Sequence, residues 1–207
     1  MTGVKLLLFS DLHCDAEAAR RLVERARSVD VVVGAGDFGN IRQGVSICID
    51  ILRAIAKPAI LVAGNNESTE ELIDACRDWP QANILHGSGV TVAGLQFFGI
   101  GGGIPVTPFG SWSYDFTEEL ATELLAGCPE DCVLVSHSPP KGAVDVSSSG
   151  RTLGSSAVRK TILRQHPRLV VCGHIHASAG RQATLGSSPV INAGPAGIEW
   201  SLTKEIL

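Results

Sequence analysis

The chain has 207 residues, of which 44% are hydrophobic and 18% charged, so we expect one domain spanning residues 1–207 with a full-sized core. Its 17 basic and 21 acidic residues give a net charge of −4, which argues against a surface that binds nucleic acid by neutralising phosphates. The six cysteines include no Cys-x-x-Cys pair and lie mostly in apolar runs, which excludes a zinc ribbon and favours reduced thiols in the cytoplasm.

The first half of the chain alternates short apolar runs with helical patterns. Strands are predicted at residues 4–9, 29–33 and 59–63, and helices at residues 16–27, 45–56 and 69–79. This order is typical of α/β proteins. The first strand follows the initiating Met1 almost at once, so we expect no secretory signal. The longest apolar stretch, residues 47–63, is interrupted by charges and a proline, so no membrane span is expected.

The second half begins with a different pattern. Segments 84–85, 90–92 and 95–100 follow one another with only glycine-containing turns between them, which predicts adjacent antiparallel strands. Further strands are predicted at 132–135, 169–172 and 190–192, and helices at 117–125 and 155–165. Segments 99–113 and 147–156 are rich in glycine and serine and should be loops. The simplest architecture is a pair of sheets with helices on the outside.

Five of the predicted strands run directly into polar side chains. Ligands of α/β proteins collect at the carboxyl ends of strands, so these residues are candidates for one site. In chain order the candidates are Asp11 and His13, Asp37, Asn65, His137, and finally His174 and His176. Each pair with one intervening residue points to one side of an extended segment. The glycines before Asp37, Asn65 and His174 allow the backbone to turn sharply and approach a ligand closely.

This donor set suits two divalent cations bridged by a carboxylate, with imidazole, carboxylate and amide oxygen as the other ligands. The motifs Asp-x-His, Gly-Asp, Gly-Asn-x-Glu, a lone His and Gly-His-x-His resemble, in this order, the calcineurin-like metallophosphoesterase family in its short bacterial and archaeal branch. The resemblance covers nearly the whole chain. It implies a four-layer α-β-β-α sandwich, with two mixed sheets flanked by helices.

The resemblance also implies how the metals are held. One ion would be bound by Asp11, His13, Asp37 and His176, and the other by Asp37, Asn65, His137 and His174. Asp37 would bridge them, and a hydroxide bridging the ions would attack the phosphorus atom of a small phosphoester, nucleotides included. The ligand types suit manganese, iron, zinc or nickel alike.

One position departs from the family pattern. Members usually carry a histidine after the asparagine ligand, and this chain has Asn66. An amide can donate a hydrogen bond to phosphate, which makes Asn66 a candidate catalytic residue, but it cannot deliver a proton near neutral pH. We therefore expect esters with acidic leaving groups to react well and alkyl esters slowly, which slightly favours phosphodiesters over monoesters.

Two loops are candidates for holding substrate. Segment 100–116 carries Trp112, Tyr114 and Phe116, which could stack on a base, and segment 139–156 carries Lys141 and Arg151, which could bind phosphate oxygens. Packing of these residues against their own domain is an equally good interpretation.

Other functions compete with this interpretation. The run Gly34-x-Gly36-x-x-Gly39 matches a dinucleotide fingerprint, but no acid ends the next strand at Ala63. The chain has no Gly-x-Ser-x-Gly elbow and no Walker lysine. A non-catalytic interaction scaffold remains an alternative, because a retromer subunit with this fold also lacks the histidine after the asparagine, although a scaffold should have eroded ligands. The mean hydropathy of +0.21 permits a homodimer without requiring one.

Overall fold

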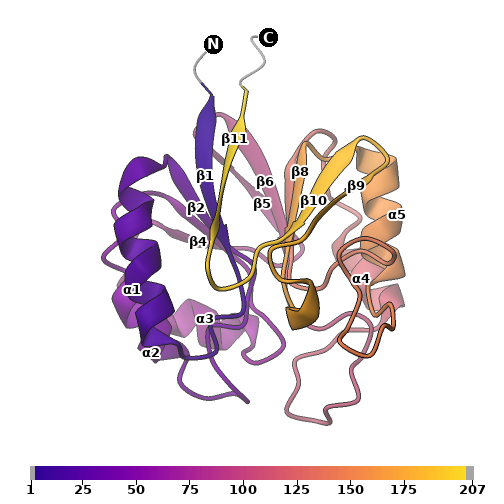
Figure 1. Cartoon of the computed structure of the whole chain (residues 1–207), viewed down its shortest axis with the longest axis horizontal. Helices are drawn as coiled ribbons and strands as arrows, with labels where there is room; N and C mark the ends of the chain where they lie inside the picture. Colours follow the sequence, from indigo (N-terminus) through magenta and orange to yellow (C-terminus); the bar gives the residue numbers. More distant parts are fainter. Residues whose placement is uncertain (1–2, 204–207) are drawn as a thin grey trace.

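The apolar runs form the strands of two sheets that pack face to face in this computed structural model, which describes residues 3–203 (Figure 1). The first sheet has the spatial order β11 (Ile198–Leu202), β1 (Val4–Phe9), β2 (Val31–Gly34), β3 (Ala59–Leu61) and β4 (Ala82–Ile84). Its strands are parallel except β11, which runs antiparallel to β1.

The second sheet has the order β5 (Ser88–Val92), β6 (Leu95–Ile100), β7 (Val133–Ser136), β8 (Leu169–Cys172), β10 (Ser188–Asn192) and β9 (Gln182–Leu185). Strands β6, β7, β8 and β10 are parallel, and β5 and β9 are antiparallel to their neighbours. Both sheets are therefore mixed, as predicted.

Helices cover the outer face of each sheet (Figure 1). The helices α1 (Ala16–Arg25), α2 (Val45–Leu52) and α3 (Thr69–Ala75) pack on the first sheet, and α4 (Glu118–Leu124) and α5 (Ser156–Gln165) pack on the second. Side chains alternate along β1, so that Leu7 and Phe9 face the helices while Leu6 and Leu8 face the other sheet. These layers are the predicted four-layer α-β-β-α sandwich.

The side chains at the helix starts account for several helix boundaries. Asp15, Ser68, Thr117 and Ser155 each accept a hydrogen bond from a backbone amide in the first turn of the helix that follows. Helices α2 and α3 end earlier than the predicted residues 56 and 79. The buried Ile55 and Trp79 extended the helical pattern of the sequence, but both lie just after the turns that end these helices, where the Trp79 indole donates to the Ile55 carbonyl.

The prediction that segment 84–85 pairs with the next two strands is wrong. Strand β4 pairs in parallel with β3, and the Leu85 amide donates to the Leu61 carbonyl, so this segment belongs to the first sheet. The chain crosses to the second sheet at Gly87, whose φ of +60° lets it turn and whose amide donates to Gly99. Only β5 and β6 form the expected antiparallel pair.

Strands β9 and β11 were not predicted. Both are edge strands with few fully buried residues, and they lack the continuous apolar run that marks the central strands. In the described part of the chain, residues 3–203, we find no helix with the length and apolar character needed to cross a bilayer.

The parallel strands of both sheets point away from the chain ends. Figure 1 shows the described chain starting and finishing at one end of the sandwich, while the loops after β1 and β2 lie at the opposite end. The loops that follow β1, β2, β3, β7 and β8 carry all the predicted metal ligands, so the fold gathers them at one edge.

Candidate metal centre

Two backbone hydrogen bonds join the loops that follow β1 and β2. The Asp11 amide donates to the Gly36 carbonyl at 2.9 Å, and the His13 amide donates to the Asp37 carbonyl at 3.0 Å. Asp11, His13 and Asp37 have φ values of 58°, 43° and 59°, a left-handed conformation that residues other than glycine rarely adopt. Such strain is concentrated at functional sites, because only a strongly determined surrounding structure sustains it.

The first group of candidate ligands comprises Asp11, His13, Asp37 and His176, whose donor atoms all lie within 4.8 Å of one another. The Nε2 atom of His13 is 2.9 Å from Nε2 of His176 and 3.5 Å from Oδ2 of Asp37. Nε2 of His176 is 3.8 Å from Oδ1 of Asp11. The His176 side chain is 61% exposed, so this group lies on the open side of the site.

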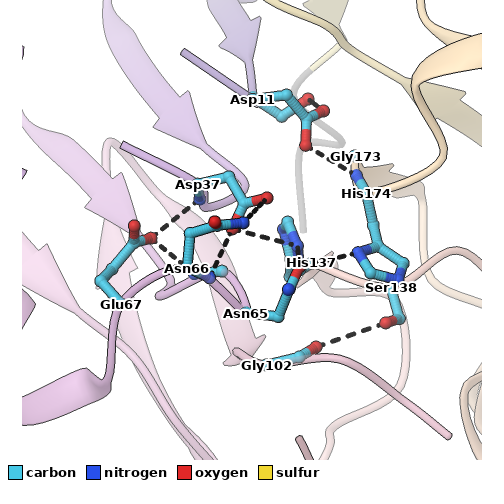
Figure 2. Close-up of polar contacts among 12 residues, drawn as sticks. Asp11, Asp37, Asn65, Asn66, Glu67, Gly102, His137, Ser138, Gly173 and His174 are labelled. Carbon is cyan, nitrogen blue, oxygen red and sulfur yellow. Dashed lines mark hydrogen bonds and ion pairs between the residues drawn. The ribbon is translucent and has the colours of Figure 1, made fainter. Parts of the chain in front are cut away.

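The second group contains Asp37, His137, His174 and Asn65 (Figure 2). Nε2 of His137 is 3.5 Å from Oδ1 of Asp37 and 3.2 Å from Oδ1 of Asn65. The same Asn65 oxygen is 3.0 Å from Nδ1 of His174. The structure thus brings together all seven residues that the sequence singled out as ligands, in the two groups that the resemblance implied.

Two neighbouring side chains hold Asp37 in place (Figure 2). Asn66 donates to both carboxylate oxygens, from its backbone amide at 2.9 Å and from its side-chain amide at 2.8 Å. The fully buried Glu67 carboxylate accepts from the backbone amides of Asp37, Gly64 and Gly39 at 2.8, 2.7 and 3.0 Å. Glu67 therefore fixes the loop on which Asp37 stands.

Asn66 was expected to donate to a bound phosphate. In the structure its Nδ2 atom donates to Asp37, and its Oδ1 atom accepts from the Ile41 amide at 2.8 Å. The side chain therefore positions the bridging candidate Asp37. Glu67 was not among the predicted site residues, although its place in the Gly-Asn-x-Glu run after a strand was a usable signal.

Burial and charge act strongly on this cluster. Burial, together with the neighbouring Asp11 carboxylate, raises the pKa of Asp37 to about 8. Burial and the nearby His137 imidazole lower the pKa of His174 well below its usual range, and burial with His176 lowers the pKa of His13. Without a cation, the Asp11 carboxylate disfavours ionisation of Asp37, and burial disfavours the protonated forms of His13 and His174.

These features fit divalent cations. Imidazole nitrogens and carboxylate and amide oxygens converge on two centres, which is the donor chemistry that transition metals prefer. A cation in each group would offset the burial and the Asp11 repulsion that raise the pKa of Asp37.

We predict that the metal-free protein loses stability as pH rises from 6.5 to 8. A carboxyl whose folded pKa lies above its ordinary 3.8 favours the unfolded state increasingly as pH climbs toward about 8. The lowered pKa of His174 destabilises the fold only below pH 6.5, and the pKa of Glu67, which burial and Asp37 raise to about 7, adds to the loss of stability only up to about that pH, so the fall between pH 7 and 8 belongs to Asp37. Thermal unfolding of chelator-treated protein should show a falling Tm that Asp37→Asn flattens and Mn²⁺ reverses. Equal slopes in wild type, Asp37→Asn and the exposed control Asp78→Asn would contradict this.

The predicted substrate residues behave differently. Lys141 and Arg151 are exposed, and among residues 3–203 neither side chain forms a hydrogen bond or ion pair with the ligand cluster. Tyr114 and Phe116 are half-buried against each other and His86 rather than open to a ligand. Trp112 instead stacks on Phe109, which was not among the predicted substrate residues.

Helices outside two mixed sheets, with paired acid and imidazole groups at the carboxyl ends of the strands, are the features of a phosphoesterase class. The calcineurin-like phosphoesterase superfamily domain matches residues 4–205, so the chain belongs to this superfamily. Its members are generally metal-dependent hydrolases. No functionally curated protein matches the chain by sequence.

Solved structures share the fold at low sequence identity. A protein of Thermus thermophilus is 19% identical, with a TM-score of 0.76 over 94% of this chain and 91% of that one. A dimetal phosphatase from Danio rerio is 15% identical, with a TM-score of 0.62 over 91% and 86%. A phosphopantetheinyl hydrolase from Mycobacterium tuberculosis is 16% identical, with a TM-score of 0.59 over 92% and 88%.

Proposed function

We propose that this protein hydrolyses phosphoesters with the help of two divalent metal ions. The observation that carries the proposal is the placement of the two oxygens of Asp37. Oδ2 faces His13 in the first ligand group, and Oδ1 faces His137 in the second. One carboxylate placed between two sets of donors is the arrangement that a shared ligand of two cations requires.

The site residues would have two roles, binding of the metal ions and positioning of the ligands. Asp11, His13, Asp37 and His176 would hold one ion, and Asp37, Asn65, His137 and His174 the other. When bound, the two ions would supply Lewis acidity toward the phosphoryl oxygens and activation of water near neutral pH. Asn66 and Glu67 keep Asp37 and its loop fixed, so that the donors are in place before substrate arrives. Manganese, iron, zinc or nickel would suit these donors.

The leaving group must depart without an acid at position 66. The Asn66 amide cannot deliver a proton, and its side chain is occupied by Asp37 and Ile41. Phosphodiesters with acidic leaving groups are therefore the preferred substrates in this proposal. General acid catalysis contributes about 100- to 10,000-fold to such reactions, so its loss should be visible in kinetics.

The rate of hydrolysis should depend steeply on the pKa of the leaving group. For the Mn²⁺-loaded enzyme we expect kcat/KM to be roughly 100-fold or more lower for methyl ethyl phosphate than for methyl p-nitrophenyl phosphate. This decrease is in addition to the difference between the rates at which aqueous Mn²⁺ hydrolyses the two esters without the protein. A series of substituted phenyl esters, measured at fixed pH, gives the slope against leaving-group pKa. A shallow slope would show that another group donates the proton.

A non-catalytic scaffold is the competing function. It has support from position 66, whereas the complete ligand set supports catalysis. Absence of turnover of bis(p-nitrophenyl) phosphate with each of the four metals, in protein shown to bind them, would favour the scaffold.

The six cysteines are free thiols and five are buried, which supports the cytoplasm as the location.

A further inference from the structure

A pair of stacked aromatic rings stands in the loop between β6 and α4. The ring centroids of Phe109 and Trp112 are 5.8 Å apart and their planes differ by only 12°. Phe109 is 52% exposed, although a large apolar side chain gains by burial. Figure 1 shows this loop projecting at the same end of the molecule as the loops after β1 and β2. The stack therefore exposes apolar ring surface to solvent at the end of the molecule that carries the candidate ligands.

Hydrogen bonds attach this loop to the candidate metal centre. Nδ2 of Asn65, whose Oδ1 faces both histidines of the second group, donates to the Ser113 hydroxyl at 3.0 Å. Ser113 in turn donates to Asp115 at 2.8 Å, and Asp115 accepts from the amide and hydroxyl of Thr107. Residues on both sides of the stack are thus tied to a predicted ligand, since Trp112 directly precedes Ser113 and Phe109 follows Thr107 by two positions.

A second attachment comes from the loop after β2. The Arg42 amide donates to the Asn66 carbonyl at 2.9 Å, and Nη1 of Arg42 donates to the Trp112 carbonyl at 3.4 Å. The Arg42 side chain is itself held by Glu71 at 2.9 Å. The backbone beneath the stack is therefore held from two directions, by Asn65 through Ser113 and by Arg42 through the Trp112 carbonyl.

We propose that Phe109 and Trp112 form a subsite for a planar aromatic group carried by the phosphoester, of which a nucleobase is one example. This inference rests on the proposed function and names its substrate class. The two rings are nearly parallel and Phe109 is half exposed, so a third ring can extend the stack. Stacking of a base on an aromatic side chain contributes roughly 10-fold or more to binding.

The test compares esters that share a leaving group. With Mn²⁺-loaded protein, kcat/KM for thymidine 5′-(p-nitrophenyl phosphate) should exceed that for methyl p-nitrophenyl phosphate by about 10-fold. Phe109→Ala and Trp112→Ala should each lower this ratio several-fold. Phe109→Leu, which keeps an apolar side chain but removes the ring, should lower it too. Leu163→Ala, which truncates an exposed residue of α5, is the matched control and should keep the wild-type ratio.

Two results would overturn the subsite. One is a Phe109→Leu variant in which the kcat/KM ratio of the thymidine ester to the methyl ester stays at the wild-type value. That result would mean that the side chain makes only apolar contact and that no ring stacking occurs. The other is a higher kcat/KM for octyl p-nitrophenyl phosphate than for the thymidine ester. That result would show that the exposed rings bind alkyl chains rather than aromatic groups. Calorimetric binding of thymidine 5′-monophosphate, compared with methyl phosphate, separates the two proposals. Binding that depends on Phe109 supports the subsite even if no ester is hydrolysed, in which case the hydrolase proposal alone fails.

Discussion

Replacement of Asp37 by alanine should remove bound metal and abolish turnover together. The two oxygens of this carboxylate face His13 and His137, at 3.5 Å each, so one substitution takes a donor from both groups. We expect metal content to fall from about two ions per chain to fewer than one, and kcat for bis(p-nitrophenyl) phosphate to fall by roughly 1,000-fold or more. Elemental analysis and steady-state kinetics on Mn²⁺-loaded protein measure the two effects.

The variant should still fold, because removal of a buried carboxyl whose pKa is raised to about 8 relieves an unfavourable group in the metal-free state. Asp37→Asn is the second variant, since it keeps the shape and removes only the charge. Asp78→Ala, at an exposed position, is the matched control and should retain both metal and activity. Full metal content in a folded Asp37→Ala protein would rule out Asp37 as the shared ligand.

The central strands and the candidate ligand positions could be predicted for the same physical reason. Buried parallel strands have continuous apolar runs, and each run ends where the chain turns, so a polar residue such as Asp11 or His137 directly after a run must lie at the sheet edge. The edge strands β9 and β11 could not be predicted because they are only partly buried. In β11, burial alternates through Glu199, Trp200 and Ser201, so no apolar run forms.

Features that depend on contacts between distant loops could not be predicted. Nothing local to Asn66 shows that its side chain turns to Asp37, since the bond exists only after β2 and β3 pair. Likewise, the sequence does not show which aromatics of segment 100–116 stay exposed. Asp115 holds Thr107 and Ser113 and leaves Phe109 open, while His86 covers Tyr114. The position of polar residues directly after strands predicted the candidate ligands, whereas tertiary hydrogen bonds determine which residues support them.

Gly64→Ala should damage the metal centre without removing any ligand. A Cβ atom at position 64 would collide with Oδ1 and the backbone amide of Asp37. The backbone at Gly64 is held in place because its amide donates a hydrogen bond to the Glu67 carboxylate at 2.7 Å. The bridging carboxylate must therefore move or the loop must shift. Displacements of this kind at a catalytic group cost about 100-fold in rate, and we expect at least that loss in kcat with weakened metal affinity.

The control for this prediction is Gly127→Ala, since a Cβ there would meet only the Phe98 ring at 3.8 Å or more, which is ordinary contact. Metal titration followed by calorimetry distinguishes a displaced ligand from a destabilised fold. A displaced Asp37 weakens Mn²⁺ binding even at temperatures where circular dichroism shows folded protein. Normal Mn²⁺ affinity and kcat in Gly64→Ala would mean that Asp37 tolerates a different position, and the shared-ligand role would then lose its geometric basis. Because Gly64 contributes no donor atom, loss of metal affinity in the folded variant reports on the placement of Asp37 and of the adjacent ligand Asn65, not on removal of a ligand.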